Sequence, residues 1–110
     1  MAVADDIKAI FDAMPAQINA DAAKGMSSTI QFKLTGDGGG DYYVEIKDGT
    51  AKVSEGTHAS PNMTMTLAAS DYVDLIMGKL NGQMAFMSGK LKIAGDMGLA
   101  MKMQTLFKRP

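Results

Sequence analysis

The side chains that could take part in catalysis are few and scattered along this 110-residue chain. His58 is the only histidine, and it lies in a polar loop at residues 56–62. A histidine that acts as a general base needs a nucleophile and an orienting partner, and the sequence identifies neither. We therefore expect His58 to be a solvent-exposed loop residue, and we predict no catalytic residues and no enzymatic activity.

A glycine-rich run, GDGGGD from Gly36 to Asp41, has the composition of a phosphate-binding loop. It lacks the Gly-Lys-Ser/Thr ending of such loops, and no helical pattern follows it to offer an N-terminus to phosphate. A hairpin loop between two strands is the simpler interpretation. Asp37, Asp41 and Asp48 do not follow the spacing of a calcium loop, whose terminal glutamate is also missing. The sequence therefore predicts no metal site and no cofactor.

The composition excludes several classes of function. A net charge of -1 and a pI near 5.7 argue against binding of nucleic acid. No apolar run approaches the roughly 20 residues that span a bilayer. The absence of cysteine excludes disulfides, thiol catalysis and zinc–thiolate sites. Asp5 and Asp6 stand where a signal peptide would carry positive charge, so we expect a cytoplasmic protein. The length is that of a single domain, which we expect over residues 1–110.

Methionine is the unusual residue of this chain. Eight of the eleven methionines lie from Met63 onward. The flexible, polarisable thioether lets a methionine-rich surface re-pack around ligands of varied shape. Methionines also fill ordinary cores, and composition alone leaves both interpretations open.

The first third of the chain predicts two helices. Apolar residues at three- and four-residue spacing predict a helix over Val3–Met14, ended by Pro15 because proline withholds its N–H. A short second helix is expected between Asn19, as its N-cap, and Gly25, as its left-handed stop.

A period of two predicts four strands, at residues 29–35, 44–47, 51–53 and 63–67. The stretches Gly36–Asp41 and Asp48–Gly49 supply hairpin turns. The alternation is typical of antiparallel strands with one buried face and one solvent-exposed face, and it assigns Gln31 to the exposed face.

The second half changes to helical spacing. Ser70 is expected to cap a helix that reaches Leu80, and Asn81 to cap a shorter one closed by Gly89. A strand at residues 91–93 follows. A strand, a helical connection of about twenty residues and another strand form the pattern of a right-handed parallel crossover. We predict an α+β fold, with helices on one face of a five-stranded, mostly antiparallel sheet.

The last helix, capped by Asp96, is apolar over an arc of roughly 220°, about twice the width that docking on a core requires. The surplus must face a cavity, a ligand or another chain. Gln104 falls inside this arc, where it could anchor a ligand head group or bond to backbone. The apolar residues of the arc are Leu106, Leu99, Met103, Phe107, Ala100, Met97 and Met101.

Along nearly its whole length the chain resembles the sterol carrier protein 2 (SCP-2) lipid-binding domain. The strongest match is MGKLNGQMAFMSGKLKIAGDMGLAMKMQ, residues 77–104, supported by MTMTLAASDYVDLIMGK from Met63 and IKDGTAKVSEG from Ile46. Gly82 replaces the family's proline, which should loosen that helix start. Lys108-Arg109-Pro110 is unlike the Ser-Lys-Leu peroxisomal address, so we expect a free-standing, bacterial-type member.

The resemblance implies that the sheet and helices enclose an apolar tunnel for fatty acids, acyl-CoAs, sterols or phospholipids. The implied function is non-enzymatic binding and transfer or presentation of lipid, with acyl chains the first choice. We expect the C-terminal helix to be the gate for exchange, because a terminal element has few covalent constraints on opening. The ligand-binding residues expected from the family motif and from strand alternation are Phe32, Ile46, Met65, Met77, Gln83, Phe86, Met87, Ile93, Met97, Met101, Met103 and Gln104.

The alternative is an interaction module, in which the wide apolar face of the last helix buries against a second copy or a partner enzyme. We expect a monomer with a lipid ligand, transient membrane contact and no nucleic-acid partner. An acyl-CoA hydrolase would need a base and a nucleophile that the sequence does not supply.

Overall fold

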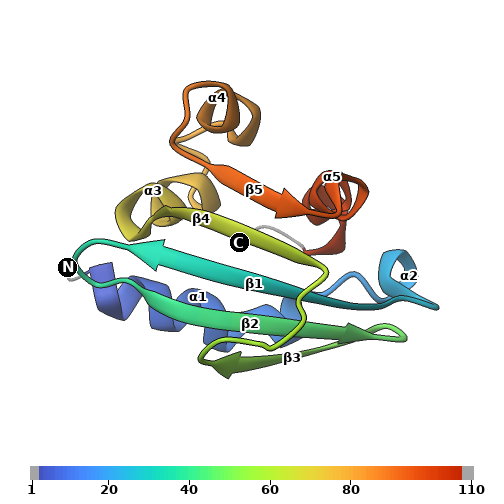
Figure 1. Ribbon diagram of the computed structural model, residues 1–110. Helices are drawn as coiled ribbons and strands as arrows, with labels where there is room; N and C mark the ends of the chain where they lie inside the picture. Colours follow the sequence, from blue (N-terminus) through green and yellow to red (C-terminus); the bar gives the residue numbers. More distant parts are fainter. Residues whose placement is uncertain (1–2, 108–110) are drawn as a thin grey trace.

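The computed structural model describes residues 3–107 and shows an α+β fold around a five-stranded sheet of order β3-β2-β1-β4-β5 (Figure 1). Residues 1, 2 and 108–110, which include the C-terminal sequence considered above, lie outside the described residues, as does the side chain of Gln104. The elements are α1 (Val3–Gln17), α2 (Ala20–Ala23), β1 (Ser27–Thr35), β2 (Gly40–Lys47), β3 (Thr50–Glu55), β4 (Met63–Ala68), α3 (Ala69–Ile76), α4 (Gly82–Met87), β5 (Lys92–Gly95) and α5 (Met97–Leu106).

The sheet is mostly antiparallel, as predicted. β1 pairs with β2 and β2 with β3 through the two expected hairpins. In the second turn Asp48 and Gly49 have φ angles of 45° and 86°, the left-handed values that a two-residue hairpin turn requires. Within residues 3–107, the one parallel pair of strands joins β1 to β4.

The predicted parallel crossover into the last strand is wrong. β5 pairs antiparallel with β4, and Lys92, its first residue, stands opposite Thr66 near the end of β4. α3 carries the chain away from the end of β4, and α4 brings it back to the same end. The two helices therefore act as a long hairpin loop rather than as a crossover.

The connection from β3 to β4 is the true crossover, and it buries Gln31. Residues 56–62 cross in front of β2 and β1 in Figure 1, on the side of the sheet opposite α1. Beneath this segment Gln31 is only 1% exposed. Its amide donates to the Gly56 carbonyl at 3.0 Å, and its Oε1 accepts from the His58 N–H at 2.7 Å. The prediction that Gln31 faces solvent is therefore wrong.

The core lies between the sheet and α1. The Phe11 ring stacks on Tyr42 of β2 at 4.3 Å and meets Phe32 of β1 edge-on at 5.2 Å. α1 does not stop at Pro15, as expected, but runs to Gln17. Proline removes a single N–H from the last turn, and that loss is small beside the packing of the apolar face.

Three of the four predicted N-caps are confirmed. The side chains of Asn19, Asn81 and Asp96 accept hydrogen bonds from the first-turn N–H groups of α2, α4 and α5. Ser70 is not a cap, because α3 begins at Ala69, directly after β4, and Ala68 at the N-cap position makes no side-chain bond. A strand that runs straight into a helix leaves no loop residue to do the capping.

Candidate functional site

A cavity of about 450 Å³ lies over β4 and β5, enclosed by α1, α3, α4 and α5. Met65 and Ile93, paired across β4 and β5, form part of its floor. Its walls come mainly from the helices. The lining residues are Ile10, Met14, Gln17, Met65, Tyr72, Leu75, Ile76, Gly82, Gln83, Phe86, Leu91, Ile93, Met97, Ala100, Met101, Met103 and Phe107.

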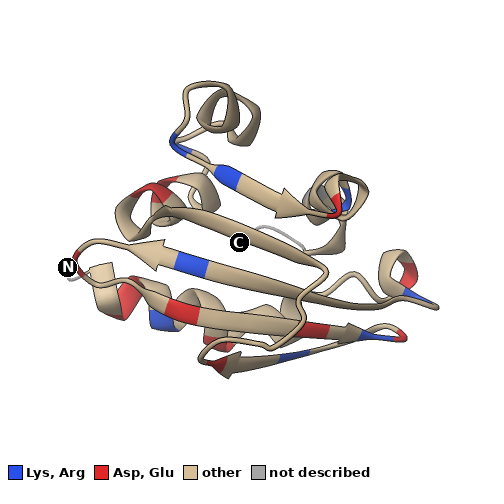
Figure 2. Ribbon diagram, in the orientation of Figure 1, with Lys and Arg blue, Asp and Glu red and all other residues tan. Residues whose placement is uncertain are grey.

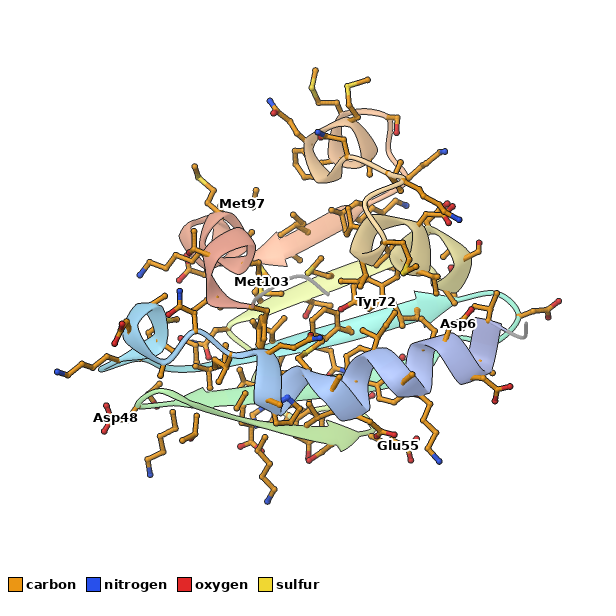
Figure 3. All side chains as sticks on the ribbon, turned by 180° about the vertical axis from the view of Figure 1, so that it is seen from behind. Asp6, Asp48, Glu55, Tyr72, Met97 and Met103 are labelled. Carbon is orange, nitrogen blue, oxygen red and sulfur yellow. The ribbon has the colours of Figure 1, made fainter. Side chains whose placement is uncertain are left out.

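The wide apolar arc of α5 divides between core, cavity and surface. Leu99 and Leu106 are buried in the core. Ala100 and Met103 are half-buried and line the cavity. In Figure 3 Met103 turns in toward the sheet, whereas Met97 points outward. The surplus apolar surface of this helix therefore divides between the cavity and the outer surface, where Met97 and Met101 are 47% and 78% exposed.

Seven of the twelve residues predicted from the sequence line this cavity: Met65, Gln83, Phe86, Ile93, Met97, Met101 and Met103. Phe32 and Ile46 do not, because they are buried in the core, 0% and 1% exposed. Met77 and Met87 do not either, because they are 62% and 74% exposed on the outer surface. The side chain of Gln104 lies outside the described part of the chain.

On α4 the division between cavity and solvent follows the helical period. Gln83 and Phe86, three residues apart, line the cavity. Met84 and Met87, also three apart, form the exposed side of the same short helix. The family motif led us to expect Gln83, Phe86 and Met87 near the ligand, and only the docked position of the helix separates Met87 from the other two.

The sequence-based prediction missed the contributions of α1 and α3. Ile10, Met14 and Gln17 lie on one stripe of α1, and Tyr72, Leu75 and Ile76 come from α3. The helical spacing of Ile10 and Met14 marked them as an apolar face. It did not indicate that the C-terminal half of that face meets a cavity rather than the core.

The polar groups of the cavity are few and uncharged. Among the described lining residues, Gln17, Gln83 and Tyr72 carry polar side chains, and none carries a charge. Tyr72 is 2% exposed, and burial raises the pKa of its phenol above the ordinary value because the phenolate would be poorly solvated. The site can therefore hold an apolar molecule with a small polar part.

His58 has a structural place away from the cavity. It is half-buried rather than exposed as expected, and its ring lies 5.2 Å from that of Tyr43. Its Nδ1 accepts from the Ser60 N–H at 3.0 Å, and its own N–H binds Gln31. These contacts hold the crossover segment on the face of the sheet opposite the cavity.

A second hollow, of about 510 Å³, lies between α1 and the edge strand β3. Lys8, Asp12, Lys52 and Glu55 border it, so its rim is charged.

Within residues 3–107, no group of three His, Cys, Asp or Glu side chains is placed to hold a metal ion. Nor is any helix of that range long and apolar enough to cross a membrane. The apolar cavity under α4 and α5 is the better candidate for a lipid site.

Comparison with known proteins agrees with the fold and the cavity. A model of the SCP-2 sterol transfer family matches residues 7–108. Hydroxysteroid dehydrogenase-like protein 2 of Xenopus tropicalis is 36% identical over 97 residues, which make up 87% of this chain and 23% of that protein. Sterol carrier protein 2 of Homo sapiens is 40% identical over 90 residues, 79% of this chain and 16% of that protein.

A solved structure of palmitated SCP2L2 from Aedes aegypti superposes with a TM-score of 0.72 at 28% identity, covering 94% of this chain and 91% of that one. The chain thus spans less than a quarter of the two sequence relatives and nearly all of this structural one.

Proposed function

Because the chain belongs to the SCP-2 sterol transfer family, we propose that it is a carrier that binds a lipid in the cavity under α4 and α5 and does no chemistry on it. The observation that carries this proposal is a cavity of about 450 Å³ whose described lining has no charged group and no nucleophile paired with a base. Small-molecule sites of roughly 300–1,000 Å³ have the same character, an apolar lining with a few polar groups.

An acyl chain is the ligand that this lining suits best. Met14, Met65, Met97, Met101 and Met103 can all adjust their rotamers around a flexible chain. Burial of a sixteen-carbon chain at about 0.8 kcal/mol per methylene gains on the order of 12 kcal/mol. The cost of ordering the chain reduces this gain and leaves micromolar or tighter binding. The palmitated relative from Aedes aegypti supports the same ligand class.

Lipid exchange requires part of the wall to move, and α4 is the better gate. The C-terminal helix α5, expected to open, anchors Leu99 and Leu106 in the core. Its end is tied to the body where the Asn19 N–H donates to the Leu106 carbonyl at 2.6 Å. α4 buries only Ala85 and stands away from the sheet in Figure 1. Opening α4 therefore breaks fewer contacts.

The test is a titration of purified, delipidated protein with a fluorescent fatty acid. Ala100→Phe places a ring in the cavity and should weaken binding at least about tenfold, since the ring takes space that the ligand needs. Ala94→Phe is the matched control, because Ala94 pairs with Thr64 and is exposed on the other face of β5. The control should bind as the wild type does. Absence of saturable, competable binding by the wild type would overturn the proposal.

A further inference from the structure

The large apolar side chains that the described structure leaves exposed gather in one region. All six come from residues 77–101, although the described chain is more than three times longer than that stretch. Figure 3 shows sulfur atoms projecting outward from α4 and from α5. We call this set the methionine patch; its members, 44–78% exposed, are Met77, Met84, Phe86, Met87, Met97 and Met101.

The methionine patch borders the opening of the cavity. Phe86, Met97 and Met101 belong both to the patch and to the cavity lining. A molecule that leaves the cavity between α4 and α5 would therefore pass over the patch. An apolar surface that continues an apolar cavity to the outside is an interaction site rather than scattered exposure.

The charges within residues 77–107, the stretch that carries the methionine patch, are almost all positive, and Asp71 and Asp74 of α3 lie just before it. Residues 77–107 contain four lysines, Lys79, Lys90, Lys92 and Lys102, all exposed, and one acid, Asp96. Residues 3–76 contain eleven acids and five lysines. Figure 2 shows the same division, with blue near α4 and β5 and most of the red on the rest of the molecule. Such a separation of charge orients a protein over an anionic surface.

We propose that the methionine patch and its lysines dock on an anionic lipid bilayer and present the cavity opening to it, an inference that rests on the proposed lipid-carrier function. Unbranched methionine side chains can insert among acyl chains while the lysine ammonium groups meet anionic head groups. A second copy of this chain would bring lysines against lysines. The outer side of α1 is a poor alternative surface for docking on an anionic bilayer. It carries one lysine, Lys8, and three acids, Asp5, Asp6 and Asp12.

The first test is co-sedimentation with vesicles, either of phosphatidylcholine alone or of equal parts phosphatidylcholine and phosphatidylglycerol. The protein should bind the mixed vesicles at least about tenfold more tightly, because each lysine near an anionic surface adds favourable energy. Equal binding to the two kinds of vesicle would overturn the proposal.

Two double variants separate the patch from the cavity. Met84→Ser/Met87→Ser removes apolar side chains that do not line the cavity, so vesicle binding should fall about tenfold while fatty-acid affinity stays unchanged. Lys90→Gln/Lys102→Gln should also weaken binding about tenfold. Lys47→Gln/Lys52→Gln makes the same change in net charge on β2 and β3, at the edge of the sheet opposite β5, and should bind as the wild type does.

The outcomes keep the two proposals apart. Failure of the wild type to bind fatty acid overturns the carrier function. If fatty acid binds normally but vesicle binding is unchanged in the patch variants, only the docking surface is overturned. The same holds if vesicle binding falls equally in the two lysine double variants. A dimer in sedimentation that the methionine variant abolishes, without vesicle binding, would make the patch a protein interface and would also overturn it.

Discussion

Phe32 and Met65 are register partners on the adjacent parallel strands β1 and β4, yet only Met65 reaches the cavity. Phe32 is closed in by the Phe11 ring at 5.2 Å and the Tyr72 ring at 5.6 Å. Met65 instead lines the cavity beside its other partner, Ile93. The boundary between solid core and cavity therefore falls between two neighbouring strands.

This boundary predicts different costs for truncating the two side chains. Phe32→Ala should lower the free energy of unfolding by about 3–5 kcal/mol, since its ring is packed on all sides. Met65→Ala should cost nearer 2 kcal/mol, because the side chain already lacks packed neighbours where it meets the cavity. Urea denaturation of the delipidated proteins measures both. Equal costs would mean that the cavity is filled by side chains in solution.

Replacement of Gln31 should lower the stability of the fold without changing lipid binding. The Gln31 side chain bonds to Tyr42, Gly56 and His58. Gln31→Met keeps the size but removes this partner from three partly buried backbone groups, so the free energy of unfolding should fall by about 1–3 kcal/mol. Lys33→Met, two residues along on the same face but exposed, should change it by less than about 0.5 kcal/mol.

Fatty-acid affinity provides the second measurement on these variants. Because Gln31 lies on the face opposite the cavity, the affinity of Gln31→Met should match that of the wild type under conditions where both are folded. A loss of affinity would show that the crossover segment and the cavity are coupled through the sheet.

The case of Gln31 shows how far sequence patterns reach. Alternation places Gln31 and Lys33 on the same side of β1, and the structure agrees with the side. Burial differs because residues 56–62 cross over Gln31 and leave Lys33 uncovered. That path depends on strand order in the sheet, which local periodicity does not contain.

The same limit separates the predicted site residues. Strand alternation identifies the inward face of Phe32 and Met65, but it cannot tell a position under α1 from one beside it. The three N-caps, by contrast, were predictable from Asn19, Asn81 and Asp96 themselves, because capping needs only a side chain and the next two or three N–H groups. Local chemistry was readable from the sequence, and the place of the cavity was not.

The two caps beside the cavity predict which helix opens. Asn81→Ala and Asp96→Ala should each weaken a helix start by about 1 kcal/mol. If α4 is the gate, Asn81→Ala should speed release of a fluorescent fatty acid about fivefold, the factor that corresponds to about 1 kcal/mol. Asp96→Ala should instead lower global stability, because α5 anchors the core.

Release into acceptor vesicles, followed by stopped-flow fluorescence, measures the rate, and urea denaturation measures the stability. Asn81→Asp and Asp96→Asn keep a capping oxygen and serve as controls. Faster release in Asp96→Ala than in Asn81→Ala would return the role of gate to α5.

Gly82 offers the opposite change at the same helix start. It is the first residue of α4, and Asn81 before it is extended, with φ −82° and ψ 129°, a conformation that a following proline permits. An added Cβ would meet only Leu75 Cδ1, at 3.5 Å. Gly82→Pro should therefore fold normally and slow lipid release about two- to fivefold, since proline stiffens the opened segment. Release as fast as that of the wild type would argue against α4 as the gate.

Tyr72 predicts how stability depends on alkaline pH. Its pKa lies above the ordinary value of 10.0 in the folded protein because burial disfavours the phenolate. The folded protein thus holds this proton more tightly than the unfolded chain does, so the stabilisation is complete below pH 10.0 and is lost as the pH rises above it. The phenylalanine of Tyr72→Phe cannot ionise, so the free energy of unfolding of this variant should fall less steeply than that of the wild type over that range.

Tyr42→Phe is the comparison. Burial, Glu55 and Asp12 also raise the pKa of Tyr42, but this half-buried ring should contribute less to the pH dependence. Urea denaturation at neutral pH and in steps above pH 10.0 measures the slopes, and parallel curves for wild type and Tyr72→Phe would show that the phenol is solvated in the folded state.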